Sequence, residues 1–191
     1  MPYEPIIWGI ALAAAAGLRL FAPFVFVGAL ARYAGMPTPE LLEWTASDAG
    51  FLLLLIATLV EILGDKIPLV DHGLDAVATL LKPAAGVLLP LALVYDLSPA
   101  AAWVLGIAAG GPLALGIHAT KAGTRAASTA TTVGVANPFL SFLEDMMAAL
   151  ILLFTLLAPA FAVLLVVLLV ALTARALVRM RRRRLARTVT R

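Results

Sequence analysis

Charged and titratable side chains gather in two blocks of an otherwise apolar chain. The first block contains Glu61, Asp65, Lys66, Asp71, His72, Asp75 and Lys82, and the second contains His118, Lys121, Arg125, Glu144 and Asp145. Charges within or beside membrane segments are costly unless they pair or meet water, so such residues mark functional sites by default. The two blocks are therefore the candidate site for an ion or a charged small solute.

The spacing of these residues predicts shared helix faces, because side chains three or four positions apart lie on one side of a helix. The predicted stripes are Glu61 with Asp65; Asp71, Asp75 and Lys82 with His72 beside them; His118, Lys121 and Arg125; and Ser141, Glu144 and Asp145 near the amino end of a helix. Both signs of charge occur in these stripes, so composition alone does not choose the sign of a ligand.

Three kinds of chemistry fit this mixed set. Carboxylates and histidines can coordinate a divalent metal ion or relay protons. The lysines and the arginine can instead hold an anionic group. In the third interpretation, acid and base only neutralise one another between packed helices, as Asp75 with Lys82 or Glu144 with Arg125 would do. No catalytic residue is assigned, and a divalent metal ion is a candidate cofactor.

Arg19 is a further candidate, because it lies alone near the middle of the first apolar run. Pro23 follows one turn later, where the missing backbone donor would bend or break a helix. A charge at this depth needs a partner. We expect Arg19 either to pair with Glu61 or Glu144 or to lie on a solute pathway.

The composition of the chain predicts an integral membrane protein. Hydrophobic residues make up 63% of the sequence and charged residues 13%, with a mean hydropathy of +1.04. A helical crossing needs about 20 residues, so 191 residues leave no room for a soluble domain. Cysteine is absent, which excludes disulfides and thiolate metal sites. The predicted fold is an all-α, polytopic membrane helix bundle.

Six spans are predicted, over about residues 6–31, 49–63, 74–94, 100–118, 139–157 and 160–178. Residues 119–138 are rich in Ala, Thr, Ser and Gly, and we expect either a cytoplasmic loop or a re-entrant segment there. Ser47 and Asp48 can cap the second span, and Pro159 suits the first turn of the last one.

Glycines in the fourth span indicate a close helix contact. Gly106 and Gly110 are four residues apart, and small residues at that spacing let two helices approach closely. The sequence Gly110-Gly111-Pro112 is a plausible kink. Because one six-helix unit encloses little polar volume, we expect a homodimer, with the Gly106 and Gly110 face as the candidate contact.

The positive charge is concentrated at the carboxyl end. The arginines there are Arg175, Arg179, Arg181, Arg182, Arg183, Arg184, Arg187 and Arg191, and the rest of the chain holds 6 basic and 11 acidic residues. An arginine run after an apolar helix marks a cytoplasmic end and contacts anionic lipid headgroups, so nucleic-acid binding is not expected. The predicted division is a transmembrane domain over 1–178 and a basic cytoplasmic tail over 179–191.

The positive-inside rule then predicts the orientation. Six crossings place both termini in the cytoplasm, with Lys66, Lys121 and Arg125 on the same side. Both charged blocks would lie in the cytoplasmic half of the bilayer, carried by the hairpins between spans two and three and between spans four and five.

Several longer stretches of the sequence resemble the bacterial membrane proteins grouped as the domain of unknown function 4126 family. They are EILGDKIPLVDHGLD over 61–75, KP at 82–83, HATKAGTR over 118–125, SFLED over 141–145 and GLR at 17–19. The resemblance covers about residues 5–175. It implies a polytopic helical architecture in a bacterial cytoplasmic membrane and supplies no catalytic roles.

The favoured function is a small transporter or channel-like protein whose polar site binds an ion or a charged small solute. Protonation of Glu61, Glu144 or Asp145 would be a natural coupling step. No nucleotide-binding loop, zinc-protease motif or nucleophile elbow occurs in the sequence. An enzyme acting on a lipid or isoprenoid phosphate held by Lys121 and Arg125 is the alternative, and a structural or accessory subunit is another.

Overall fold

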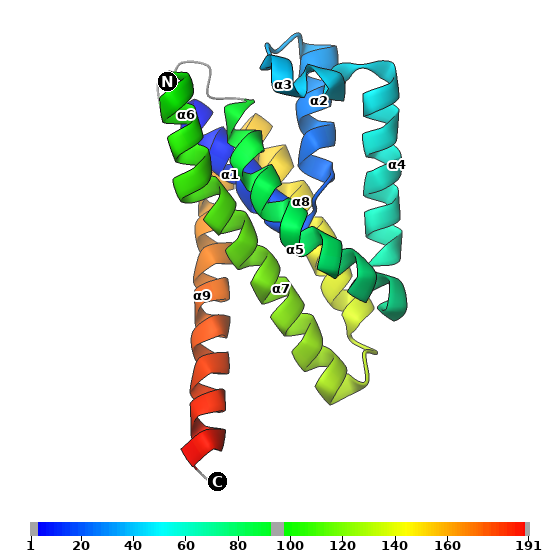
Figure 1. The fold of residues 1–191 in the computed structure, drawn as a ribbon, viewed down its shortest axis with the longest axis vertical. Helices are drawn as coiled ribbons and strands as arrows, with labels where there is room; N and C mark the ends of the chain where they lie inside the picture. The colour runs from blue at the N-terminus through cyan, green and yellow to red at the C-terminus, as the bar shows by residue number, and fades with distance from the viewer. Residues whose placement is uncertain (1–3, 93–97, 190–191) are drawn as a thin grey trace.

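The computed structural model describes residues 4–92 and 98–189, and this part of the chain contains helices and no strand (Figure 1). The helices are α1 (Glu4–Leu18), α2 (Ala22–Ala34), α3 (Glu40–Glu43), α4 (Asp48–Gly64), α5 (Pro68–Leu91), α6 (Pro99–Leu105), α7 (Gly111–Thr132), α8 (Asn137–Leu157) and α9 (Pro159–Val189), with short turns of 3₁₀-helix at Trp44–Ala46 and π-helix at Gly106–Gly110. The prediction of an all-α fold is confirmed.

The first apolar run is broken into two helices. The backbone leaves the helix after Leu18, and α2 begins at Ala22 with Pro23 in its first turn, where the missing donor costs nothing. Figure 1 shows α1 descending to the middle of the bundle and α2 returning toward the end at which α1 began. The prediction of a single crossing over 6–31 is therefore wrong, because these residues form a V whose apex, residues 19–21, lies inside the bundle.

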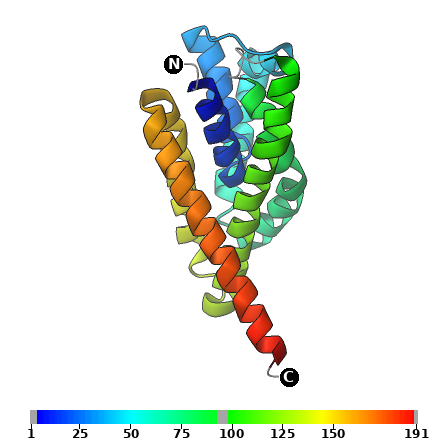
Figure 2. The same cartoon turned by 90° about the vertical axis from the view of Figure 1, so that its left-hand side faces the viewer.

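The remaining long helices run up and down beside this V. Along the long axis, α4, α5, the joined α6 and α7, α8 and α9 alternate in direction (Figure 1). Because α2 returns toward the end of the bundle at which α1 began, the two chain ends lie at opposite ends of the molecule (Figure 1). The six-crossing scheme placed them on one side. Figure 2 shows the last part of α9 extending beyond the other helices.

Two helices are long and apolar enough to cross a membrane by length and composition, namely Pro99–Thr132 and Asn137–Leu157. The pair Glu40–Ala46 and Asp48–Gly64, which is bent by 76°, raises the number to three within the described residues. Shorter apolar helices cover Pro5–Leu18, Ala22–Ala34, Ala76–Leu91 and Phe161–Leu172. Among the described residues, fewer helices thus meet the length criterion than the six spans expected, and α1 and α2 divide one of the expected runs between them.

The centre of the bundle is the alanine-rich helix α1. Leu12 and the alanines around it, from Ala11 to Ala16, are almost fully buried, and α5, α7, α8 and α9 pack around them. Small side chains let these helices approach closely. Large apolar side chains such as Leu53 and Leu59 are instead exposed on the outer face of α4, as in a protein surrounded by lipid.

The close contact expected at Gly106 and Gly110 is confirmed, and its partner is α5 of the same chain. A Cβ added at Gly106 would collide with the carbonyl oxygen of Val87, and one at Gly110 would collide with that of Gly86. The proposed use of this face in a dimer is therefore wrong, because α5 already covers it. Beside the position where a kink was expected, Gly110-Gly111-Pro112, residues Gly106–Gly110 form a π-helical turn within the helical run Pro99–Thr132.

The small-residue tract is helical. Helix α7 continues through residues 119–132, and irregular backbone is confined to the turn where Val133 and Gly134 have φ values of 54° and 83°. The expectation of a loop or re-entrant segment is wrong for residues 119–132, because alanine, the strongest helix former, recurs through this stretch. As a result, His118, Lys121 and Arg125 form the predicted stripe, and all three are buried.

Candidate functional site

The carboxylate of Asp65 is the centre of the charged cluster. Asp65 follows α4 in the turn before α5 and is only 3% exposed. Its Oδ2 accepts a hydrogen bond from Lys121 Nζ at 2.7 Å and from Arg125 Nη2 at 3.1 Å. The same oxygen also pairs with Arg19 Nη1. One carboxylate thus joins both charged blocks and the isolated arginine.

Glu144 extends the cluster onto α8. Arg125 donates to it through two bonds, from Nε to Oε1 at 3.3 Å and from Nη2 to Oε2 at 2.6 Å. Lys121 Nζ lies 3.5 Å from the same Oε2. The pairing of Glu144 with Arg125 expected from the sequence is present. It is a fork-shaped contact that orients both side chains.

Arg19 reaches α8 as well as Asp65. Its Nη2 lies 2.6 Å from Asp145 Oδ1 and 3.1 Å from Ser141 Oγ. Asp145 Oδ2 in turn accepts from Lys66 Nζ at 3.0 Å. Neither Glu61 nor Glu144, the partners expected from the sequence, holds the guanidinium. Because the helix breaks after Leu18, Arg19 lies toward the α4–α5 turn and pairs with Asp65 and Asp145 instead.

Glu61 binds backbone at the apex of the V. Its Oε1 accepts from the N–H of Leu20 at 2.8 Å, and its Oε2 accepts from the N–H of Phe21 at 3.2 Å. The first N–H groups of a helix have no partner within the helix and carry a partial positive charge. Leu20 and Phe21 immediately precede α2, so the carboxylate on α4 satisfies two N–H groups of the connection and lies beside the positive end of that helix.

Lys82 binds the other side of the same break. Its Nζ donates to the carbonyl oxygens of Leu18 at 3.0 Å and Gly17 at 3.3 Å, at the negative end of α1. It lies 3.9 Å from Glu61 Oε1 and is fully buried. Sequence reasoning singled out both charges but missed these backbone partners, which only the break in the helix creates.

A cavity of about 120 Å³ lies beside the break. Its wall contains the charged side chains of Glu61, Asp65, Lys82 and Lys121. Val77, which also lines it, is 57% exposed, so the cavity opens on the outer side of α5. At about 30 Å³ per water, the space holds roughly four water molecules.

A second, larger cavity of about 280 Å³ lies on the other side of the cluster, between α7, α8 and α9. Most of its wall is apolar, with Ile117, Leu143 and Met147 among the lining residues. Lys121 and Glu144 are its charged wall groups. Lys121 therefore lines both cavities, and the charged cluster separates them.

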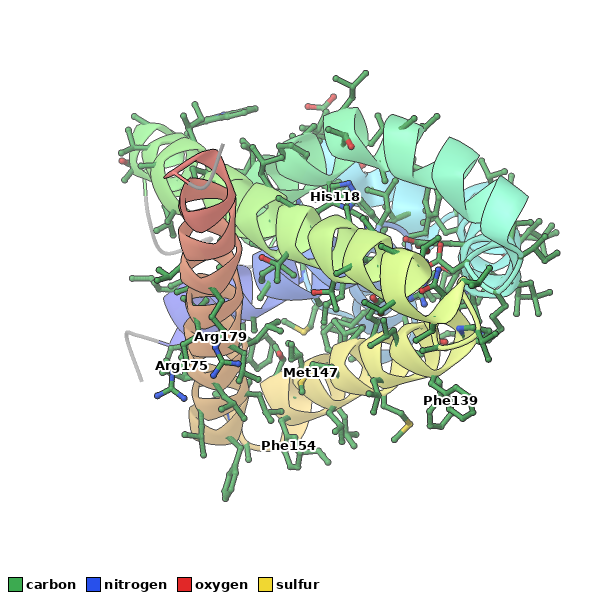
Figure 3. All side chains as sticks on the ribbon, turned by 90° about the horizontal axis from the view of Figure 1, so that it is seen from below. His118, Phe139, Met147, Phe154, Arg175 and Arg179 are labelled. Carbon is green, nitrogen blue, oxygen red and sulfur yellow. The ribbon has the colours of Figure 1, made fainter. Side chains whose placement is uncertain are left out.

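The other predicted site residues stand as follows. His118 is buried, and its Nε2 lies 3.1 Å from Thr79 Oγ1 of α5. Figure 3 shows His118 on the side of α7 that faces α5. Asp71, His72 and Asp75 belong to the first turns of α5, and their side chains lie outside the part of the chain that the structure describes.

Metal binding finds no site among the side chains described. No group of three or more His, Cys, Asp or Glu residues in that part of the chain could hold a metal ion. The acidic groups there face lysine and arginine instead. A divalent metal ion stays a prediction, since three of the candidate ligands are not among the described side chains.

Comparison with known proteins gives one match. The family described as Domain of unknown function (DUF4126) matches residues 6–179. No curated protein and no solved structure matches the chain.

Proposed function

The chain belongs to the DUF4126 family, and we propose that it is a small membrane transporter or channel-like protein whose mixed-charge site binds an ion or a charged small solute. The broken helix carries this proposal. The apex of the V lies inside the bundle, Glu61 and Lys82 cap its two helix ends, and a cavity opens beside it.

Membrane energetics support this interpretation. Irregular backbone at membrane depth is tolerated only where it is buried in protein or lines a water-filled cavity. In many transporters, substrate and ion sites form at discontinuous helices, whose ends supply partial charges near the middle of the bilayer. The break between Leu18 and Ala22 is buried in the bundle, and Glu61 and Lys82 bind the backbone beside its two helix ends.

The two cavities suggest a route. The smaller one reaches the cluster from the α4 and α5 side, and the larger one reaches it from the α7, α8 and α9 side. Lys121 lies on both walls and pairs with Asp65 and Glu144. Exchange of its partners would let a charged solute pass from one cavity to the other.

The orientation in the membrane belongs to the same proposal. The arginine-rich carboxyl end and the α4–α5 turn with Lys66 lie toward one end of the bundle (Figure 1). Glu40, Glu43 and Asp48 belong to the connection at the other end. The positive-inside rule places the first end in the cytoplasm of a bacterial cell. Because α2 returns toward the end at which α1 began, the amino terminus lies on the outer side of the membrane. The arginine tail at the cytoplasmic end contacts anionic lipids.

Ion and solute flux in reconstituted vesicles tests the proposed function. Purified protein in vesicles of neutral and anionic lipid is expected to increase the leak of small ions above that of empty vesicles. Asp65→Asn, which removes the central carboxylate, should change this flux, whereas Asp48→Asn on the exposed amino end of α4 should not. Flux equal to that of empty vesicles for every cation and anion tried would overturn the proposal.

An enzyme acting on a lipid phosphate is the second candidate, and the larger cavity is the observation that favours it. Apolar walls with Lys121 at one side would suit an acyl or isoprenoid chain with an anionic headgroup. Phosphate release from a lipid phosphate, without any flux, would favour this function. The same assay on Lys121→Gln would show whether that ammonium group holds the headgroup.

A further inference from the structure

We propose that the 120 Å³ cavity beside the helix break is a binding site for a small anion, which exchanges with the carboxylate of Glu61. This inference rests on the proposed function, because it names the class of solute that the charged site takes. It is drawn from four observations: the hydrogen-bond capacity of the cavity wall, the charges of that wall, the partners of Glu61, and the size of the cavity.

The hydrogen-bond capacity of the wall favours an acceptor as ligand. Both Glu61 oxygens accept from backbone N–H groups, and Asp65 Oδ2 accepts from Lys121 and Arg125 and pairs with Arg19. A lysine ammonium has three donors. Lys82 gives two of them to carbonyl oxygens, and its 3.9 Å separation from Glu61 is too long for a hydrogen bond. The third donor of Lys82 is therefore left for an acceptor inside the cavity.

Charge points the same way. Among the described side chains, the cavity wall carries two carboxylates and two ammonium groups. One of these carboxylates, that of Asp65, also pairs with Arg19 and Arg125, which do not line the cavity. Lys121 already pairs with Asp65 and Glu144, whereas Lys82 lies 3.9 Å from Glu61, so Lys82 is the wall ammonium group that an added anion would neutralise.

Glu61 occupies the place that an anion would take. Its carboxylate binds two successive backbone N–H groups, of Leu20 and Phe21, which is the arrangement that backbone offers to anionic ligands. An entering anion can accept these two bonds. The displaced carboxylate then closes the gap to Lys82, which already lies 3.9 Å away. Every buried charge keeps a partner during this exchange.

The size of the cavity limits the ligand. A space for roughly four water molecules admits chloride, nitrate, formate or bicarbonate. An anion such as gluconate, with its chain of hydroxylated carbons, needs far more space than roughly four water molecules occupy. The site should therefore select anions by size as well as by charge.

Thermal unfolding of the purified full-length chain in detergent tests the site. Sodium chloride, nitrate, formate and gluconate are compared at equal ionic strength, and a ligand that binds the folded state raises its unfolding temperature with concentration. The small anions are expected to raise it, and gluconate is not. Equal effects of all four anions, or a dependence on the cation at constant anion, would overturn the proposal.

Variants separate exchange from simple binding. Glu61→Gln keeps the side chain's size but removes the competing charge, so the apparent Kd for nitrate should fall by roughly tenfold or more. Lys82→Gln should abolish the nitrate effect, while Lys82→Arg should retain it. Asp48→Asn removes another carboxylate from the same helix, outside the cavity, and should leave the Kd unchanged. An unchanged or weaker nitrate affinity in Glu61→Gln would contradict the exchange.

Flux measurements distinguish this proposal from the proposed function. If small anions bind but no solute crosses reconstituted vesicles, the anion site stands and transport fails. If cations cross and anions neither bind nor cross, transport stands and the anion site fails.

Discussion

Glu61 and Lys82 face each other across the break between α1 and α2 with Nζ 3.9 Å from Oε1, and each binds the helix end of opposite charge. The carboxylate accepts from the N–H groups of Leu20 and Phe21, and the ammonium donates to the carbonyl oxygen of Leu18. The pair is therefore oriented by the backbone and not only by mutual attraction.

This orientation gives an unusual expectation for a charge swap. Exchanging the partners of an ordinary ion pair restores it, but Glu61→Lys with Lys82→Glu would place each charge beside a helix end of the same sign. The double variant should unfold at a lower temperature in detergent than either Glu61→Gln or Lys82→Gln. Recovery of the wild-type unfolding temperature by the swap would show that only the mutual attraction matters.

Neutralising Asp65 should be far more destabilising than neutralising an exposed carboxylate. Asp65→Asn leaves Arg19, Lys121 and Arg125 converging on an uncharged group, and breaking such a buried pair costs about 3–5 kcal/mol. Asp48→Asn removes an exposed partner of Arg32 at the amino end of α4, so it should cost much less stability.

Unfolding in detergent of both variants measures the difference. If Asp65→Asn and Asp48→Asn lowered the free energy of unfolding by similar amounts, Arg19, Lys121 and Arg125 would have found other partners, such as solvent in the cavity.

Helix packing at the π-helical turn predicts a contrast between two glycines. Gly110→Ala should destabilise the fold by about 1–3 kcal/mol, because the new methyl group meets the backbone of Gly86 and α5 must move away. Gly116→Ala, further along the same run of helix, meets no atom within 4 Å. There the better helix propensity of alanine should leave stability unchanged or raise it by up to about 1 kcal/mol.

Thermal unfolding of Gly110→Ala and Gly116→Ala under the same conditions measures this difference in stability. If Gly110→Ala were as stable as Gly116→Ala, the close approach of α5 to the π-helical turn would be wrong.

Local signals in the sequence were sufficient for the elements that depend on neighbouring residues. Ser47 accepts from the N–H of Gly50 at 3.1 Å and caps α4 as expected, and α9 begins at Pro159. The glycine spacing in the fourth run likewise predicted a close helix contact. Each of these features depends on the conformational preference of one or two residues.

The path of the first run could not be predicted in the same way. Pro23 indicated a bend or a break, but hydropathy is identical for a helix that crosses a membrane and for two that enter and return. The partners of Arg19 and Glu61 follow from that path. Asp65 and Asp145 meet Arg19, and backbone N–H groups meet Glu61, only because the chain turns at Leu18. Contacts between residues this far apart in the sequence leave no periodic pattern of residue types from which they could be predicted.

The V-shaped path makes its own prediction about topology. The chain has no cysteine, so single cysteines can be introduced and labelled without background. Glu40 follows the V, whereas Val133 lies in the α7–α8 turn and is 91% exposed. Glu40→Cys and an amino-terminal tag should be reached by an impermeant reagent from one side of the membrane, and Val133→Cys from the other. Arg179→Cys, near the end of α9, should be labelled from the same side as Val133→Cys. If the tag and Arg179→Cys were reached from the same side, residues 6–31 would cross the membrane once, and the break could not lie at the apex of a returning V.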